Sequence, residues 1–334
     1  MLEIALRIVR LARLMGPLPA LHLLGALLRA LTALSRLARA SPIAYRSAAV
    51  RRNLRQAFSD RTWTFRRALA EDEERQVARK IVEEIALLGM PAEPFIEYIR
   101  SRTRIDGLEH LERALRAGKG AILCTCHLGA IALVPAILVV QLPELFRAHP
   151  FVYANKRVGG TTREAIRDRI AEAARRYGAH VQEVGVEERF LSARTMARAL
   201  EHGAILYLAA DGDLFGPGRR RSPHRITIFG HTIRVGGGAA WLALRTGAAL
   251  LPAYCLRERA DRAALHILPP LEAPPGAGVA DLTERIFLAH RERLERYPAQ
   301  FLFWDRLDRL AVERAMPWGG LPAQGPGLAA SAIS

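Results

Sequence analysis

The amino-acid sequence predicts an α/β fold, in which helices flank a mixed and mostly parallel central sheet. Three observations predict it. Apolar runs of strand length alternate along the chain with longer segments of helical length. The run at 121–126 contains one polar residue, Thr125, as expected for a parallel strand that is buried on both faces. It leads into His127 and Gly129 and then into a second apolar segment, which indicates a strand, a tight turn and a helix.

The first 40 residues predict a basic amphipathic helix that associates with a membrane. Leucines recur there at spacings of three and four, and the six arginines are accompanied by one acid, Glu3. The uncharged run at 14–28 is broken by Pro17 and Pro19 and is shorter than the roughly 20 residues that span a bilayer. This favours a helix lying in the interface. A single spanning anchor, a cleaved signal peptide and a helix packed on its own domain are the alternatives.

Residues 41–312 are predicted to form one α/β domain. Its lead-in at 41–117 is helical and charged, and the four acids at 71–74 suggest a helix start, where negative charge suits the helix dipole. Beyond about residue 312 the composition turns to Gly, Pro, Ala and Ser, which predicts a disordered tail at 313–334.

The remaining elements of the domain follow in order, and each is recognised by its periodicity and its flanking turn residues. The predicted strands are 151–154, 181–184, 204–210, 225–228, 232–235, 250–255 and 264–268, with 225–228 and 232–235 forming a hairpin. The predicted helices are 161–177, 192–201, 239–246 and 281–296. A basic, glycine-rich loop joins the strand that ends near residue 210 to the hairpin.

Titratable side chains follow two of the predicted parallel strands. His127 ends the first, and Asp211 ends the strand at 204–210, with Asp213 two residues later. The carboxyl ends of parallel strands meet at one edge of a sheet, where ligands bind in open α/β folds. We therefore expect Asp211 or Asp213 within about 6 Å of His127, the range in which opposite charges couple. The alternative is that Asp211 only caps a turn.

The charge balance limits the possible partners. Lys and Arg number 49 against 33 Asp and Glu, giving a net charge of +16, which attracts anionic lipid headgroups, an acidic carrier protein or nucleic acid. The charge is scattered, and no zinc-finger, RNA-recognition or P-loop pattern accompanies it, so we do not expect nucleic-acid binding. We expect no organic cofactor and no metal. The three cysteines, Cys124, Cys126 and Cys255, lie in apolar runs and are predicted to be buried thiols.

Taken together, the motifs resemble the lysophospholipid acyltransferases, and within them the branch of lipid A lauroyl/myristoyl acyltransferases and mannoside acyltransferases. The resemblance covers roughly residues 50–308. Its pieces are Arg52-Asn53-Leu54, Ala57-Phe58, His127-Leu128-Gly129, Asp211-Gly212-Asp213, Ile228-Phe229-Gly230, Thr246-Gly247-Ala248 with Pro252, Tyr297-Pro298 and Trp304-Asp305-Arg306.

The resemblance implies a glycerolipid acyltransferase-like fold and an O-acyltransferase at the cytoplasmic face of the inner membrane, held peripherally or by a single N-terminal anchor. Its donor would be acyl-ACP or acyl-CoA, and its acceptor a hydroxyl of a lysolipid or lipid A-type glycolipid. The family motif places an acid at the fifth position after a histidine general base, with four residues between the two. Here the histidine is His127 and the acid is replaced by Ala132, which makes Asp211 or Asp213 the candidate substitute.

The resemblance also implies contacts with the substrates. Backbone N–H groups near Gly129 would form an oxyanion site, and Lys156, Arg157 and Arg306 would contact anionic groups of the donor. Asp305 stands where the family more often has a histidine. Two alternatives remain open: a catalytically silent relative that binds lipid or a partner protein, and an enzyme in which Thr125 or Cys126 accepts the acyl group.

Overall fold

The computed structural model describes residues 42–155, 161–185, 189–211, 224–259 and 262–314. The predicted N-terminal membrane segment lies outside these residues, as do the basic loop at 212–223 and residues 315–334 of the predicted tail. Among the described helices, none is both long enough and apolar enough to cross a bilayer.

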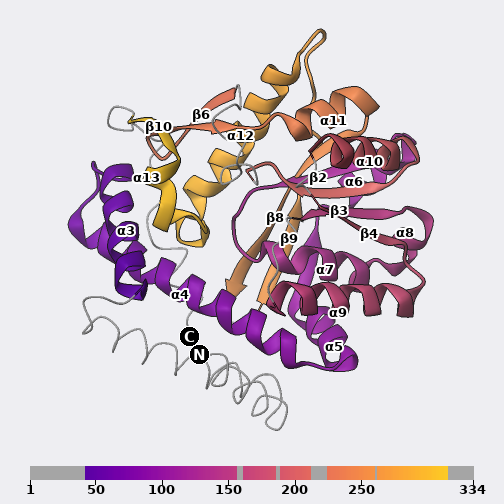
Figure 1. Ribbon diagram of the computed structural model, residues 1–334, viewed down its shortest axis with the longest axis horizontal. Helices are drawn as coiled ribbons and strands as arrows, with labels where there is room; N and C mark the ends of the chain where they lie inside the picture. The colour runs from indigo at the N-terminus through magenta and orange to yellow at the C-terminus, as the bar shows by residue number, and fades with distance from the viewer. Residues whose placement is uncertain (1–41, 156–160, 186–188, 212–223, 260–261, 315–334) are drawn as a thin grey trace.

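A seven-stranded sheet forms the centre of the molecule, with helices on both faces (Figure 1). Its strand order is β1-β9-β8-β2-β5-β3-β4, and every neighbouring pair is parallel except β8 with β9. The strands are β1 (Thr103–Asp106), β2 (Ala121–Thr125), β3 (Phe151–Asn155), β4 (Val181–Gly185), β5 (Ile205–Ala209), β8 (Ala249–Arg259) and β9 (Arg262–Ile267). The predicted mixed, mostly parallel α/β fold is confirmed.

Strand β2 lies in the middle of this sheet and has a core on each side. Its five residues are all buried. Ile122 and Cys124 belong to one apolar cluster, whereas Ala121 and Leu123 belong to the other. Successive side chains of a strand point to opposite faces, so the unbroken apolar run reflects burial on both sides.

Helices cover both faces of the sheet, and the two apolar clusters assign them. The face beside Leu123 is covered by α5 (Ala92–Arg102), α6 (Leu108–Arg116), α7 (Val134–Gln141), α8 (Pro143–Ala148) and α9 (Thr161–Tyr177). The cluster beside Ile122 includes α10 (Arg189–Glu201), α11 (Gly238–Thr246) and α12 (Val279–Arg296). It also extends to α3 (Pro42–Ala57) and the start of α4 (Trp63–Gly89), which pack against each other, and α3 packs against the segment that follows α12. After α12 come η4 (Pro298–Gln300), η5 (Trp304–Arg306) and α13 (Leu307–Leu310).

The predicted hairpin is present but belongs to a second, smaller sheet. Strands β6 (His224–Ile228) and β7 (His231–Val235) pair antiparallel around Phe229 and Gly230, both with positive φ. Strand β10 (Ala311–Arg314) pairs with the other edge of β7 and extends two residues into the predicted tail.

Two expectations for the helical lead-in are wrong. The acids at 71–74 lie inside α4, which begins at Trp63, and Glu73 is buried in an ion pair with Arg46 of α3. Strand β1 was not predicted because it has four residues, two of them charged, and pairs only with β9 at the sheet edge. The lead-in therefore contributes to the sheet as well as covering it.

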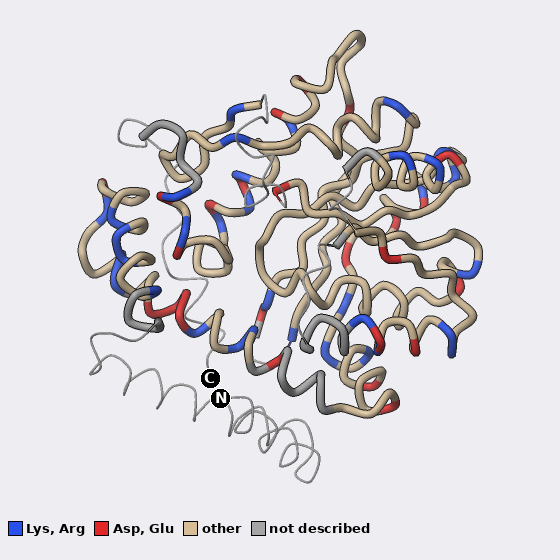
Figure 2. Tube along the Cα trace, in the orientation of Figure 1, with Lys and Arg blue, Asp and Glu red and all other residues tan. Residues whose placement is uncertain are grey.

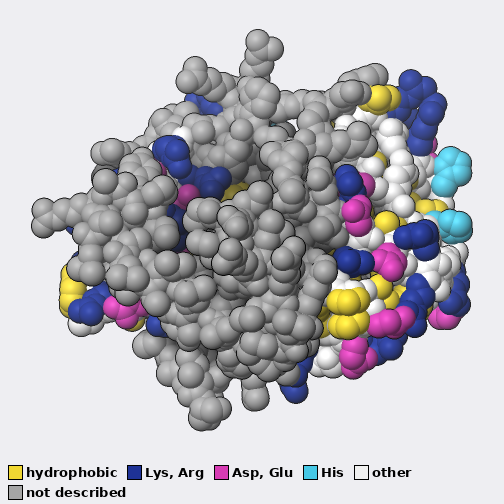
Figure 3. Space-filling model, turned by 60° about the horizontal axis from the view of Figure 1, so that its bottom comes forward, with side chains coloured by type: hydrophobic (Ala, Val, Ile, Leu, Met, Phe, Trp, Pro, Cys, Tyr) yellow, Lys and Arg dark blue, Asp and Glu magenta, His cyan; other side chains and the backbone are white. Residues whose placement is uncertain are grey.

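Positive charge is unevenly distributed over the described surface. Helix α3 carries four arginines and no acid, and Figure 2 shows these basic residues along it. By contrast, the described part of the face in Figure 3 mixes both signs of charge with single hydrophobic side chains. Among the described helices, α3 therefore carries positive charge that no acid of its own balances.

Candidate active site

Two strand ends bring His127 and Asp211 together. In the parallel pair β2 and β5, Thr125 is in register with Ala209, and each is the last residue of its strand. His127 and Asp211 both follow two residues later. Equal offsets from a shared register place the two side chains next to each other at the carboxyl edge of the sheet.

Both carboxylate oxygens of Asp211 bind His127. Oδ1 lies 2.7 Å from the ring nitrogen Nδ1, and Oδ2 accepts a 2.8 Å hydrogen bond from the backbone N–H. The carboxylate therefore fixes the direction of the imidazole and the path of the chain that carries it. The predicted proximity of these two residues is present, and Asp213 lies outside the described residues.

The charge state of Asp211 determines which ring nitrogen is protonated. Burial raises the pKa of this carboxyl, but the charge of His127 and the two hydrogen bonds from it outweigh burial, so the pKa is lowered overall. An ionised carboxylate only accepts hydrogen bonds, so Nδ1 must carry a proton, and in the neutral imidazole the lone pair then lies on Nε2. Nε2 has no hydrogen-bond partner among the described residues, and the His127 side chain is 29% exposed. This arrangement suits a general base.

A phenylalanine covers the ring of His127. The Phe303 ring lies 4.4 Å from the imidazole, centroid to centroid, at an interplanar angle of 31°. The Arg306 guanidinium lies 5.5 Å from the Phe303 centroid, and its Nε is 3.2 Å from the Asp305 carboxylate. Arg306 is thus near the candidate site. Its guanidinium contacts the Phe303 ring, and the Phe303 ring contacts His127.

The segment at 298–303, which we call the C-terminal clamp, binds the loop that carries His127. Leu302 donates a 3.0 Å hydrogen bond to the His127 carbonyl, and Gly129 donates one of 3.0 Å to the Gln300 carbonyl. The Gln300 side chain accepts from the backbone N–H of Arg257 on β8 and donates to its carbonyl, each at 2.9 Å. The clamp therefore ties the site to the central sheet.

The backbone N–H groups at Gly129, which were expected near an oxyanion site, are engaged within the protein. The N–H groups of Leu128, Gly129 and Ala130 donate to the carbonyls of Cys126, Gln300 and Cys255, respectively. Glycine is required at 129 for another reason. Its φ is +68°, and a Cβ there would lie 2.1 Å from the Cys255 carbonyl oxygen.

The remaining predicted site residues fall into two groups. Lys156 and Arg157 lie outside the described residues. Ala132 lies in the short helix η1 (Ile131–Leu133), which carries no acid, so Asp211 is the carboxylate that contacts His127. Within the described part of the chain, no group of three or more His, Cys, Asp or Glu side chains is arranged to hold a metal ion.

The cysteines beside the site are buried free thiols, as predicted. Burial raises the pKa of Cys126 well above its ordinary value. A buried, protonated thiol is a poor nucleophile, which argues against the alternative in which Cys126 accepts an acyl group. The Thr125 hydroxyl is also buried and donates to a neighbouring carbonyl, that of Cys126.

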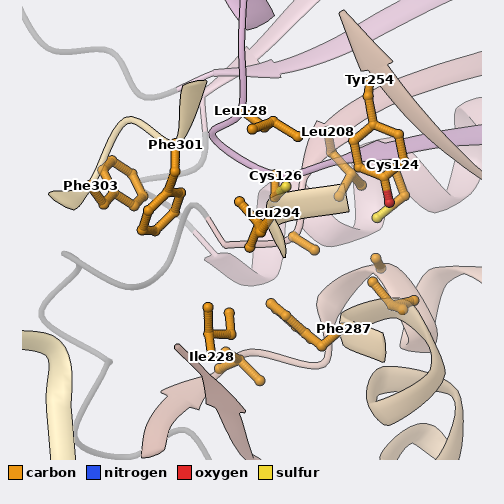
Figure 4. Packing of buried hydrophobic residues seen from close by; sticks show 14 of the residues in the cluster. Cys124, Cys126, Leu128, Leu208, Ile228, Tyr254, Phe287, Leu294, Phe301 and Phe303 are labelled. Atoms are coloured by element: carbon orange, nitrogen blue, oxygen red, sulfur yellow. The ribbon is translucent and has the colours of Figure 1, made fainter. Parts of the chain in front are cut away.

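A second histidine, His290 of α12, lies buried behind β2. Its Nδ1 is 2.8 Å from the Tyr254 hydroxyl, and its Nε2 is 3.9 Å from the Cys124 sulfur. Burial lowers the pKa of His290 to about 4, so this side chain is neutral near pH 7. Figure 4 shows Tyr254 and Cys124 side by side in this apolar region.

Comparison with known proteins agrees with the geometry. A family model described as bacterial lipid A biosynthesis acyltransferase matches residues 18–307. The chain is 28% identical over 203 residues to the phosphatidylinositol mannoside acyltransferase of Mycobacterium tuberculosis (strain ATCC 25618 / H37Rv), covering 59% of this chain and 57% of that protein. It is 28% identical over 210 residues to the protein of the same name from Mycolicibacterium smegmatis, covering 62% and 64%, respectively. The matched region is thus less than two thirds of either relative.

Proposed function

The chain belongs to the bacterial lipid A biosynthesis acyltransferase family, and we propose that it transfers a fatty acyl group to a hydroxyl of a glycolipid or lysolipid at a membrane surface. The observation that carries this proposal is the contact between Nδ1 of His127 and Asp211, which in the neutral imidazole leaves the lone pair on Nε2 at the carboxyl edge of the sheet. The names of the relatives favour a glycolipid acceptor.

The proposed reaction uses one base and one supporting acid. Nε2 of His127 takes the proton of the acceptor hydroxyl as its oxygen attacks the carbonyl carbon of an acyl thioester. The tetrahedral intermediate collapses when the carbon–sulfur bond breaks, and the departing thiolate takes the proton from the imidazolium. Asp211 stabilises that imidazolium through Nδ1 and keeps the productive tautomer. It thereby supplies what the family motif acid would supply at Ala132.

The substrates and location are part of the proposal. Acyl-ACP or acyl-CoA is the donor, and both carry phosphate that Lys156, Arg157 and Arg306 would contact. The arginines of α3 favour an anionic membrane surface as a partner. The proposed location is the cytoplasmic face of the inner membrane, held peripherally or by an N-terminal anchor.

The second candidate function is that of a catalytically silent relative that binds acyl lipid. The observation that favours it is Ala132 in place of the motif acid. If the carboxylate of Asp211 does not support catalysis, the protein lacks a base of adequate strength. The scaffold then retains only a lipid-binding role.

Acyl transfer assays distinguish the two candidates. Radiolabelled acyl-ACP and acyl-CoA are offered with a panel of glycolipid and lysolipid acceptors to wild type, His127→Ala and Asp211→Asn. A matched control is His266→Ala, because the His266 side chain is also 29% exposed and its Nδ1 contacts a carboxylate, that of Asp106 at 3.1 Å. Turnover that needs His127 and Asp211 but not His266 supports the transferase. Acyl-lipid binding by wild type without turnover supports the silent relative and refutes the transferase.

A further inference from the structure

Phe303 contacts the proposed base without taking part in proton transfer. Its ring lies 4.4 Å from the imidazole of His127 at 31°, close to the arrangement of an offset aromatic stack. The Phe303 side chain is itself buried, being 6% exposed, so the contact is shielded from solvent. The proposed mechanism gives this ring no role.

We propose that Phe303 is a positioning residue for His127, an inference that rests on the proposed function. The Asp211 carboxylate holds one atom of the imidazole, Nδ1, and a hydrogen bond to one atom leaves the tilt of the ring free. An aromatic ring on the imidazole face removes that freedom. The two contacts together fix both the direction and the plane of the base, which aims Nε2 at the acceptor hydroxyl.

The same ring favours the charged state of His127 over the neutral one. The face of an aromatic ring is negative and attracts cations. His127 becomes a cation only when Nε2 has taken the proton of the acceptor. The attraction to Phe303 therefore increases along the reaction, and a contact that is stronger in the transition state than in the ground state raises kcat.

The C-terminal clamp holds Phe303 in a fixed relation to His127. Leu302, the residue before Phe303, donates its N–H to the His127 carbonyl. The Phe301 ring packs edge-on against Phe303, with centroids 5.8 Å apart at 71°, and the two rings lie next to each other in Figure 4. The guanidinium of Arg306 also lies near the Phe303 ring, and Asp305 pairs its charge. The stacked ring is thus positioned by the segment that binds the backbone of the base.

Three variants separate the aromatic contact from simple packing. Phe303→Leu keeps an apolar side chain but removes the ring, and Phe303→Tyr keeps the ring. Phe301→Leu is the matched control, because it removes an aromatic ring from the same clamp and leaves Phe303 beside His127. The measurements are kcat and KM for acyl transfer, and NMR spectra of protein labelled at the histidine Cε1 and ring nitrogens, with His127 assigned by His127→Gln.

In Phe303→Leu we expect the ring-current shift of the His127 Hε1 signal to disappear and kcat to fall about fivefold to thirtyfold with KM unchanged, the range that a cation–π contact allows. Phe303→Tyr should retain both properties, and Phe301→Leu should retain the shift. A His127 signal that does not respond to Phe303→Leu overturns the inference. So does a lost shift with full kcat.

Failure of the proposed function would give a different result from failure of the inference about Phe303. If wild type transfers no acyl group to any acceptor, the transferase proposal fails. The NMR arm needs no substrate, so it still tests whether Phe303 holds the ring. In that case greater motion of the His127 ring in Phe303→Leu, measured by relaxation of the labelled Cε1 and absent from Phe301→Leu, supports positioning, and unchanged motion of the ring refutes it.

Discussion

Two histidine–aspartate pairs in this molecule have the same exposure of the histidine and different surroundings. His127 and His266 are both 29% exposed, and each places Nδ1 against a carboxylate, at 2.7 Å from Asp211 and 3.1 Å from Asp106. Asp211 is 3% exposed and gives both oxygens to one histidine. Asp106 is 38% exposed and also pairs with Arg104.

The pKa shifts in the two pairs differ accordingly. The pKa of Asp211 is lowered despite burial, so its charge is committed to His127. Burial lowers the pKa of His266, and although Asp106 raises it, Arg104 lowers it further. A histidine next to an aspartate is therefore not by itself a catalytic pair. The pair at the ends of β2 and β5 is distinguished by a buried carboxylate that, among the described residues, hydrogen-bonds to His127, and by the Phe303 ring that lies against the imidazole.

The largest expected effect separates the two histidines directly. His127→Gln should reduce kcat for acyl transfer by about 10⁴-fold, the upper end of what general base catalysis contributes. His266→Gln should leave kcat unchanged, because its pair lies on β1 and β9, which β8 separates from β2. The measurement is initial rates with a labelled thioester donor. Equal losses in both variants would mean that the two pairs do not differ in the way described.

Removing only the charge of each carboxylate sharpens the comparison. Asp211→Asn should reduce kcat by about 10³-fold, less than the roughly 10⁴-fold of the serine protease triad, because the amide oxygen still accepts the His127 backbone N–H. Asp106→Asn should have no effect on transfer. Rates close to wild type for Asp211→Asn would show that His127 works without its carboxylate.

His290 extends the comparison to a histidine without a hydrogen-bonded carboxylate. Its pKa is about 4 in the folded protein against an ordinary 6.5, so the unfolded chain binds more protons between these values. Stability is therefore full above about pH 6.5 and falls by up to about 3 kcal/mol as the pH drops to about 4. Asp211 loses its contribution only below its ordinary pKa of 3.8, because its pKa is lowered.

Urea unfolding across this pH range, with wild type and His290→Leu in parallel, measures the contribution of His290. The variant should lose about 1 to 3 kcal/mol near pH 7, because the Tyr254 hydroxyl is left without its partner. Its stability should depend less steeply on pH than that of wild type. The same slope in both proteins would assign the acid sensitivity to other groups.

The smallest effect concerns Arg104, the cation that distinguishes the Asp106 pair. Arg104→Met should raise the pKa of His266, because it removes a nearby positive charge and leaves Asp106 to His266 alone. The change in stability should stay within about 1 kcal/mol, since the side chains are exposed. Titration of the His266 ring signal by NMR measures the pKa. A fall or no change would contradict the assignment of Arg104 as a competing partner.

The sequence predicted the central geometry of the site because that geometry depends on strands. An apolar run before His127 and another before Asp211 identify parallel strands, and the ends of parallel strands meet at one edge. The loop that follows β2 was not predictable in the same way. The N–H groups of Gly129 and Ala130 donate to the carbonyls of Gln300 and Cys255. These partners are distant in the chain, and no local sequence pattern predicts such contacts.

Other features were missed for related reasons. In the sequence, Phe303 is an aromatic residue before Trp304, and nothing local predicts its contact with His127. That contact depends on how the C-terminal clamp packs against the loop that carries His127. The acids at 71–74 looked like a solvated helix start. The charge of Arg46, brought by α3, instead makes Glu73 a buried residue inside α4. Tertiary partners, rather than local preference, decided each case.

In the proposed mechanism, the position of Asp211 also has a consequence for how activity appears after synthesis. In a motif with the acid five positions after the histidine, the pair forms within a short local segment of the chain. Here 84 residues separate the partners, and they meet only after β2 and β5 have aligned in parallel. Such long-range pairing forms late, after the loop-closure entropy between the strands has been overcome. On refolding, recovery of acyl transfer should therefore follow assembly of the sheet and lag behind the return of helical structure.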